Sequence, residues 1–364
     1  MSCRIASSSC LLNSRWRQKV FSVGPREYAW LDVFLAAMLR GEWRLFERRF
    51  AEGLACMAAV AADPQAAWPD DRQIEEAAHT FRYERDLVAS DEIISWLDRA
   101  GLTIDAWTDY LVRRLLHDRW CDHLDDLPPQ HTASVTVDDI EFATEGLCSG
   151  TFDRFARALA GRAAASVHQD ALDHGAFATD GSCVGQLRAQ HAAWLDTLHP
   201  GDVSERIMHL AQLESGFHTQ ARAAASVDAL ASQVARHRLE WTRVDLERVS
   251  FDTADAAREA ICCVRDDGLT LTDVAIESRR AVRDTRDLLE RIEPEVRDAV
   301  LSASVDQVVG PVTVGPRYEV VCVVDKRPAD LADPLVRERA EAAVIEQMVA
   351  RAVLMHVRWA GRPR

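Results

Sequence analysis

The chain has 364 residues, of which 48% are hydrophobic and 28% are charged. This composition is typical of a folded protein and argues against a disordered one, and a length of about 150 residues per domain predicts two or three domains. Acidic residues outnumber basic ones by 58 to 43, which gives a net charge of −15. So large a negative excess argues against a phosphate backbone or an anionic membrane as a general partner. The sequence also lacks the run of about 18 apolar residues that a membrane span needs.

The basic residues are almost all arginine, because Lys19 and Lys326 are the only lysines. Arginine is better than lysine at bidentate pairing with carboxylates. We nevertheless interpret the bias as the codon usage of a GC-rich bacterial genome, since alanine and aspartate are abundant too.

The cysteines predict a reducing compartment. Nine are scattered along the chain, none forms C-x-x-C, and the adjacent Cys262 and Cys263 can pair only with strain. Such a pattern is typical of free thiols and not of a disulfide framework. The first 25 residues lack the apolar run of a secretory signal, so we expect a cytoplasmic protein. No phosphate-binding or dinucleotide-binding motif occurs, and no cofactor is predicted.

The first two thirds of the chain predict helices. Residues 1–25 are polar and are expected to be loose. From Arg26, apolar residues recur at three- and four-residue spacing, the pattern of a buried helical stripe, and predict an N-terminal helical domain over 26–125. The prolines of Asp125–Gln130 predict a linker. Helical spacing returns over 137–240, a second helical region.

At Trp241 the pattern changes to mixed strands and helices, which predicts an α+β domain over 243–328. A C-terminal helix over 333–360 follows, which we expect to pack on the helical body. The fold class is therefore mainly α, with one α+β domain. The predicted elements of that domain are a strand at Arg243–Phe251, helices at Ala254–Asp266, Leu269–Ser278 and Glu295–Ser302, and a hairpin of Val308–Val314 and Tyr318–Asp325.

The α+β domain resembles parvulin-type peptidyl-prolyl isomerases. The similar segments, in order, are RVSF with DTADAAREAICCVRDDG, LTDVAIES, RIEPEVRDAVLSA and VVGPVTVGPRYEVVCVVDKRP. The last segment, residues 308–328, is the most specific because its Gly-Pro turn, its hairpin spacing and its final K-R-P all match the family pattern.

The wider layout is similar to SurA-type chaperones, in which N- and C-terminal helices form one peptide-binding module around a parvulin domain. The chain also resembles cytosolic parvulin-related proteins that act in the maturation of ribosomally made peptides. The Trp241-Thr242-Arg243 entry, the 266–278 run and the polar N-terminus carry that second likeness.

The family's catalytic residues are absent. The resemblance implies two histidines and a Cys or Asp beside an apolar proline pocket, but Arg248 and Glu319 occupy the histidine positions. Asp284 is the only candidate for the acid. We expect Arg248 and Glu319 to pair on neighbouring strands. A general base needs a pKa tuned to neutral pH, and an adjacent arginine lowers the pKa of a carboxylate, so no catalytic residue is predicted.

The peptide-binding pocket is expected to remain apolar. By the resemblance, Ile292 and Val296 replace the Met and Phe of the proline pocket, and the wall loses its aromatic ring. With Leu301, Phe251 and Tyr318 they form the predicted peptide-binding surface.

A metal site is not predicted. His117 and Cys121 share a helix face, with His123 and His131 further on, but no fourth ligand stands at the spacing of a zinc motif. Ordinary polar surface is the favoured interpretation of these residues.

The sequence thus predicts a non-catalytic peptide-binding or chaperone-like accessory protein. Its partner would be an unfolded segment or a precursor peptide during maturation, together with the enzyme that modifies that peptide. Two alternatives remain open: an active prolyl isomerase with an atypical site, and a structural subunit of a modifying-enzyme complex.

Overall fold

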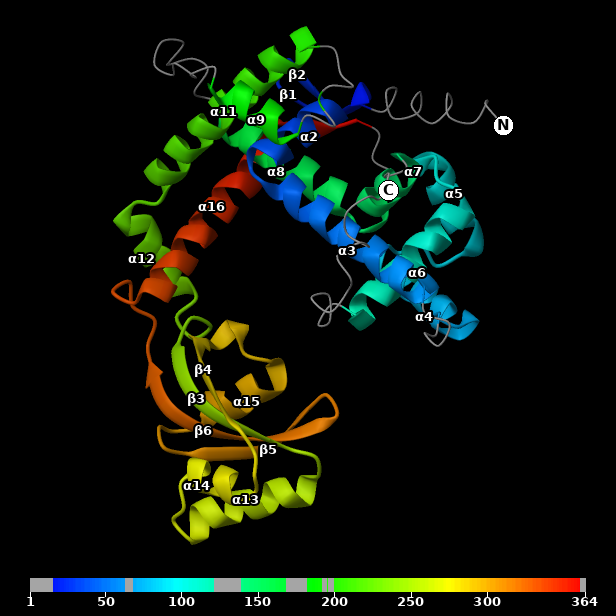
Figure 1. Ribbon diagram of the computed structural model, residues 1–364. Coiled ribbons are helices and arrows are strands. Elements are labelled where there is room, and N and C mark those ends of the chain that lie inside the picture. The colour runs from blue at the N-terminus through cyan, green and yellow to red at the C-terminus, as the bar shows by residue number, and fades with distance from the viewer. Residues whose placement is uncertain are drawn as a thin grey trace. The chain divides into compact units, whose positions relative to one another are not determined.

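The structure is a computed structural model that describes residues 16–62, 68–120, 139–167, 182–191, 195 and 200–360. The predicted linker at Asp125–Gln130 lies outside the described residues. The chain divides into two compact units, unit 1 (Met1–His218 with Val349–Arg364) and unit 2 (Thr219–Met348). Helices predominate and one α+β region is present (Figure 1), which confirms the predicted fold class.

Unit 1 is built from helices around an aromatic core. Phe34 lies at its centre, with ring centroids 5.3 Å from Trp43 and 4.7 Å from Phe152. A small antiparallel sheet, in the order β2-β1-β7, covers part of this core. The described elements are β1 (Lys19–Val23), β2 (Arg26–Ala29), α2 (Trp30–Leu39), α3 (Glu42–Ala62), α4 (Asp71–Glu84), α5 (Ser90–Ala100), α6 (Ile104–Trp120), α7 (Asp139–Cys148), α8 (Thr151–Ala165), α9 (Ser182–Gln190), the first part of α11 (Pro200–Ala224), the end of α16 (Pro334–His356) and β7 (Val357–Trp359).

The sheet of unit 1 differs from the sequence prediction at both ends of the chain. Residues 19–23, expected to be loose, form β1, in which every residue except Lys19 is buried. The C-terminal helix, expected to reach 360, ends at His356 and is followed by β7. Phe21 of β1 pairs with Trp359 of β7. Strand β7 is stabilised by a partner from the other end of the chain, whereas β1 also pairs with β2, residues 26–29, where the sequence predicts a helix.

Unit 2 contains a four-stranded antiparallel sheet in the order β4-β3-β6-β5. Helices α13 and α14 pack on one face and α15 on the other (Figure 1). The described elements are the end of α11, α12 (Val227–Arg236), β3 (Arg243–Phe251), α13 (Ala254–Asp266), α14 (Leu271–Glu277), β4 (Val282–Leu288), the short 3-10 helix η3 (Leu289–Arg291), α15 (Pro294–Ser302), β5 (Val308–Val314), β6 (Arg317–Arg327) and the first part of α16.

Local sequence signals explain most elements of this sheet unit. Thr253 and Thr270 cap α13 and α14 through their side-chain oxygens, and Pro294 starts α15 at the first turn, where its missing N–H costs nothing. Lys326 ends α15, because its Nζ donates to the carbonyls of Val300 (2.8 Å), Leu301 (2.9 Å) and Ala303 (3.0 Å). The predicted bounds of β3 and α13 are confirmed.

Strand β4 was not expected from the sequence. Its residues, VRDTRDL, are mostly charged and only Leu288 is fully buried. It pairs with β3 over seven residues without a register shift. As the edge strand it needs few apolar side chains, so the alternating pattern that identifies a half-buried strand is missing.

A further hydrophobic cluster of unit 2 lies at the start of β3. Trp241 is fully buried with Leu288, Leu230 of α12, and Val336 and Ala340 of α16. Its Nε1 donates to Glu290 (3.0 Å), and Arg339 donates to the same carboxylate (2.7 Å) while its guanidinium lies 5.3 Å from the Trp241 ring centroid. These contacts join the sheet to α12 and to the start of α16 inside unit 2.

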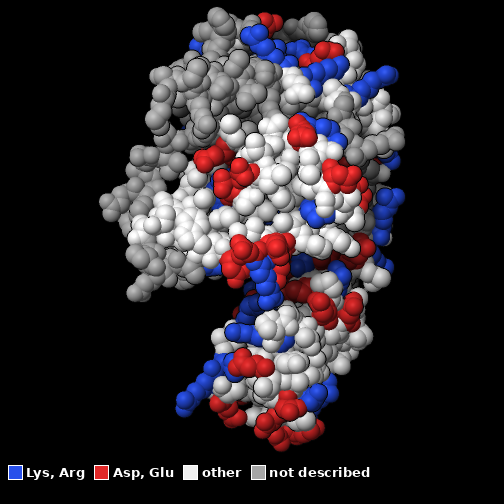
Figure 2. Space-filling view, turned by 90° about the vertical axis from the view of Figure 1, so that its right-hand side faces the viewer, with Lys and Arg blue, Asp and Glu red and all other residues white. Residues whose placement is uncertain are grey.

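The surface mixes charges of both signs. Figure 2 shows acidic and basic side chains interspersed among apolar and polar ones on the face that it presents. No helix in the described part of the chain is both long enough and apolar enough to cross a bilayer.

Candidate functional site

Arg248 forms the centre of the candidate site, on β3 in the middle of the sheet. Only 3% of its side chain is exposed. Its Nε donates to Glu319 Oε2 (2.7 Å) and its Nη1 donates to Glu293 Oε2 (2.8 Å). Strands β3 and β6 are neighbours in the sheet, so the predicted pairing of Arg248 with Glu319 is confirmed.

A second arginine closes the cluster into a ring. Arg283 of β4 lies 3.2 Å from Glu319 Oε1 and 4.0 Å from Glu293 Oε1. Arg248, Glu319, Arg283 and Glu293 therefore alternate in charge around one ring, which we call the charge quartet. Ser250 Oγ also donates to Glu319 Oε1 (3.3 Å). The members nearer the solvent are Arg283, 58% exposed, and Glu293, 42% exposed.

The electrostatics hold Arg248 and Glu293 in their charged forms. Burial by itself lowers the pKa of Arg248, but the hydrogen bonds to Glu293 and Glu319 outweigh it and raise the pKa above its ordinary value. The hydrogen bond from Arg248 in turn lowers the pKa of Glu293. Neither of these two groups changes its charge near neutral pH, so Arg248 and Glu293 are suited to orienting strands and side chains and not to moving protons.

Asp284, the third degenerate position, lies apart from the quartet. In the β3–β4 register, Arg283 is opposite Arg248 and Asp284 is opposite Glu247. Neighbouring residues of a strand point to opposite faces of the sheet. The Asp284 side chain is therefore on the face away from Arg248, and the structure does not bring it to the predicted cluster.

The predicted peptide-binding residues do not form one surface. Ile292 and Val296 are buried in the core between α15 and the sheet. Phe251 is buried on the opposite face, where Tyr318 packs beside it. Leu301, 45% exposed, is the one that faces solvent most. The sequence identified apolar positions correctly, but the protein's own core occupies most of them.

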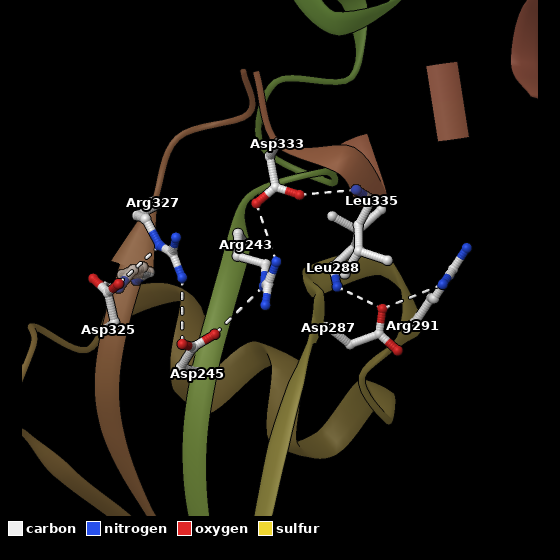
Figure 3. Close-up of polar contacts among 10 residues, drawn as sticks. Arg243, Asp245, Asp287, Leu288, Arg291, Asp325, Arg327, Asp333 and Leu335 are labelled. Carbon is white, nitrogen blue, oxygen red and sulfur yellow. Dashed lines mark hydrogen bonds and ion pairs between the residues drawn. The ribbon is translucent and has the colours of Figure 1, made fainter. Parts of the chain in front are cut away.

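A second polar cluster connects the start of β3, where the chain enters the sheet, with the end of β6, where it leaves (Figure 3). Arg243, at the start of β3, lies 3.4 Å from Asp245 and 3.1 Å from Asp333. Arg327, at the end of β6, contacts Asp245 (3.3 Å) and Asp325 (2.8 Å). Asp333 also accepts from the N–H of Leu335 in the first turn of α16. The cluster thus connects β3, β6 and the start of α16.

Sequence reasoning missed two members of the quartet, Arg283 and Glu293. Glu293 directly precedes Pro294, the first residue of α15, and that position carries a sequence signal because a proline restricts the backbone of the residue before it to extended conformations. Arg283 could be placed only once β4 was known to be a strand.

The metal prediction is tested only in part. His117 lies 3.5 Å from Glu52, while Cys121, His123 and His131 lie outside the described residues. Among the described residues, no group of three or more metal-ligating side chains is gathered in one place.

Comparisons with known proteins give structural likeness alone. No family model and no curated protein matches the sequence. PrsA from Bacillus cereus, a peptidylprolyl isomerase, is 12% identical with a TM-score of 0.33, over 60% of this chain and 87% of that one. PrsA from Bacillus subtilis has the same identity and coverage with a TM-score of 0.22. A structure from the work on the SurA-like chaperones PEB4 and Cj1289 of Campylobacter jejuni is 9% identical over 75% of this chain and 96% of that one, with a TM-score of 0.17. Likeness at these scores carries no argument about function.

Proposed function

We propose that this chain is a non-catalytic, chaperone-like protein that holds extended or unfolded peptide segments. The observation that carries the proposal is the charge quartet. Two of its members, Arg248 and Glu319, occupy the positions at which the resemblance to parvulins implies histidines, and each buried charge in the quartet is matched by an opposite one.

The quartet is poorly suited to prolyl isomerisation. The barrier of about 18–20 kcal/mol arises from amide conjugation, and a catalyst must stabilise the twisted bond better than the planar one. In the quartet, Arg248 already donates to two carboxylates, and Glu319 accepts from Arg248, Arg283 and Ser250. Breaking these contacts to serve a substrate would leave a buried charge uncompensated.

Unit 1 offers apolar surface for an unfolded segment. Along α4, α5 and α6 several large apolar side chains are exposed, whereas Phe81 and Leu111 of the same helices are buried in a core. Contiguous exposed apolar patches mark sites of protein interaction, and we propose that these side chains contribute to one. The exposed members are Tyr83, Val88, Ile94 and Ile104.

We further propose a cytoplasmic setting and a basic precursor peptide as client. The described cysteines Cys56, Cys148, Cys262, Cys263 and Cys322 are free thiols, which supports a reducing compartment. The net charge of −15 favours a basic leader segment. If this holds, affinity for a basic peptide falls as salt rises; an affinity that does not change with salt removes the electrostatic part of the proposal.

Two assays on the same preparation test the central proposal. The first follows cis/trans exchange of a proline peptide, and we expect no acceleration above the uncatalysed rate. The second measures suppression of aggregation of an unfolded protein, and we expect protection at stoichiometric ratios. Acceleration that is lost in Glu319→Gln would establish an active isomerase with an atypical site and refute the proposal.

Variants then locate the binding surface. Replacing Tyr83 and Ile104 together by serine should weaken protection, whereas serine at Leu45, an exposed apolar position on α3, serves as the matched control. Absence of any peptide affinity, together with tight binding to a folded partner, would favour the structural-subunit alternative.

A further inference from the structure

Strand β4 carries a self-complementary sequence. Its residues are Val282, Arg283, Asp284, Thr285, Arg286, Asp287 and Leu288. When the sequence is reversed about Thr285, every arginine meets an aspartate: Arg283 meets Asp287, and Asp284 meets Arg286. Thr285 meets itself. An antiparallel pair of two identical β4 strands therefore matches opposite charges at four places.

The outer side of β4 is available for such pairing. It is the terminal strand of the sheet order β4-β3-β6-β5, so only its inner side is paired, with β3. Arg283, Asp284 and Arg286 are exposed. Among the described residues, Asp284 and Arg286 take part in no ion pair. The strand has neither proline nor bulge; charged side chains also keep sheet edges apart, but those of β4 match opposite charges when a second β4 pairs with it.

The backbone N–H and C=O groups of alternate β4 residues point toward the free edge of the sheet. The N–H of Leu289 donates to the carbonyl of Thr242 on the β3 side. Because successive residues of a strand turn their backbone groups alternately to its two neighbours, Leu288 turns outward. In agreement, the N–H of Leu288 is bonded by the Asp287 carboxylate instead of by β3 (2.7 Å; Figure 3). By the same alternation, Asp284 and Arg286 present their N–H and C=O groups on the free edge.

We infer that β4 is the interface of a twofold-symmetric homodimer in which two copies of the chain pair antiparallel about Thr285. The outward backbone groups of Asp284 and Arg286 then bond to those of Arg286 and Asp284 in the second copy, and their side chains form opposite-charge cross-strand pairs. The two sheets become one continuous sheet. The same patch serves both copies, as a twofold interface requires.

The pairs between Asp284 of one copy and Arg286 of the other decide the specificity of this interface. Leu288 is fully buried in its own core, Asp287 already contacts Arg291 (3.4 Å), and Arg283 already contacts Glu319. Asp284 and Arg286 form no ion pair within the described part of the chain, so both side chains can pair with the second copy. A second copy fits better than a client peptide because it presents an opposite charge at each of these positions, whereas an arbitrary extended segment leaves some of them unmatched or meets them with a like charge, which is destabilising.

The test is a charge-swap series on the full-length chain, followed by sedimentation velocity and light scattering. The wild type should reach twice 40.6 kDa as concentration rises. Arg286→Asp and Asp284→Arg should each raise the dissociation constant by at least about tenfold. The double variant Asp284→Arg/Arg286→Asp restores the pairs and should dimerise again. The two single variants, mixed together, should form a heterodimer.

A control variant separates this interface from general charge effects. Arg258→Asp makes the same charge change on the exposed face of α13 and should leave the dimer intact. Circular dichroism of every variant checks that it is folded. A chain that stays monomeric up to its solubility limit overturns the inference. So does a dimer that the single reversals leave unchanged, or one that the double variant fails to restore.

Discussion

Replacing Arg248 by leucine should destabilise unit 2 by about 2–4 kcal/mol. The change removes two charge-assisted hydrogen bonds, each of which contributes about 1.5–3 kcal/mol, and leaves Glu319, whose side chain is 6% exposed, with one partner fewer. Two such bonds sum to about 3–6 kcal/mol, but the loss is smaller than this sum and stays below the upper end of the roughly 3–5 kcal/mol found for broken buried pairs, because both carboxylates keep other partners or water. Glu319 keeps Arg283 and Ser250, and Glu293 can return to water.

A double variant shows whether the cost comes from the charge or from the volume. Arg248→Leu/Glu319→Leu leaves neither buried charge uncompensated, so it should be more stable than the sum of the two single changes predicts. Urea unfolding followed by circular dichroism measures both effects. Because the chain forms two compact units, the curve is fitted with two transitions, and the one that shifts belongs to unit 2.

The pH dependence gives a second check on the same residues. The pKa of Glu293 is lower in the folded chain than its ordinary value of 4.5 because Arg248 donates to it. Its stabilisation is therefore complete above about pH 4.5 and is lost as the pH falls through the folded-state pKa. Glu293→Gln should flatten this part of the stability curve. The urea experiment can also contradict these expectations. A fall of less than about 0.5 kcal/mol in the free energy of unfolding of Arg248→Leu would refute the reasoning, and so would a double variant whose loss equals the sum of the two single losses.

Three further predictions follow from the packing. Burial raises the pKa of the Cys148 thiol to about 12, whereas Cys262 is exposed. A thiol-reactive reagent should therefore modify Cys262 in the folded chain and Cys148 only after unfolding, and mass spectrometry locates the modified residues. Modification of Cys148 in the folded chain would contradict this. Arg339→Ala removes the contact over Trp241 and the bond to Glu290 and should cost about 1–3 kcal/mol in urea unfolding, whereas Arg339→Lys should recover part of it. Lys326→Met removes three hydrogen bonds at the end of α15 and should increase amide exchange there; unchanged exchange would show that the bonds do not hold the helix end.

Elements whose signals are local could be predicted from the sequence. The alternation of Arg243–Phe251 and the Thr253 cap fixed both bounds of β3 and α13, since a period and a cap are properties of a few neighbouring residues. Strand β7 could not be found in this way, because its partner β1 comes from the other end of the chain and no short window of sequence contains both. Strand β1 also pairs with the neighbouring β2, but the apolar spacing that starts at Arg26 predicts a helix and not the second strand of a hairpin.

The candidate site was predictable to the same extent. Arg248 and Glu319 lie on two well-marked strands and occupy the positions of the two histidines in the parvulin resemblance, so their pairing could be predicted. Arg283 depended on the unrecognised β4, and Glu293 on the position of α15 relative to the sheet. The predicted pocket residues do not lie on one surface because apolar character does not distinguish a core position from a binding position: Val296 and Phe251 are apolar and lie in the core.

The scarcity of lysine makes Lys326 a built-in chemical reporter. An amine-reactive reagent has only Lys19, Lys326 and the chain's own α-amino group to attack. The Lys326 amine can react only after leaving the three carbonyls that it caps. Its labelling rate therefore measures how often the end of α15 opens, at one site of a chain of 364 residues and without any engineered probe.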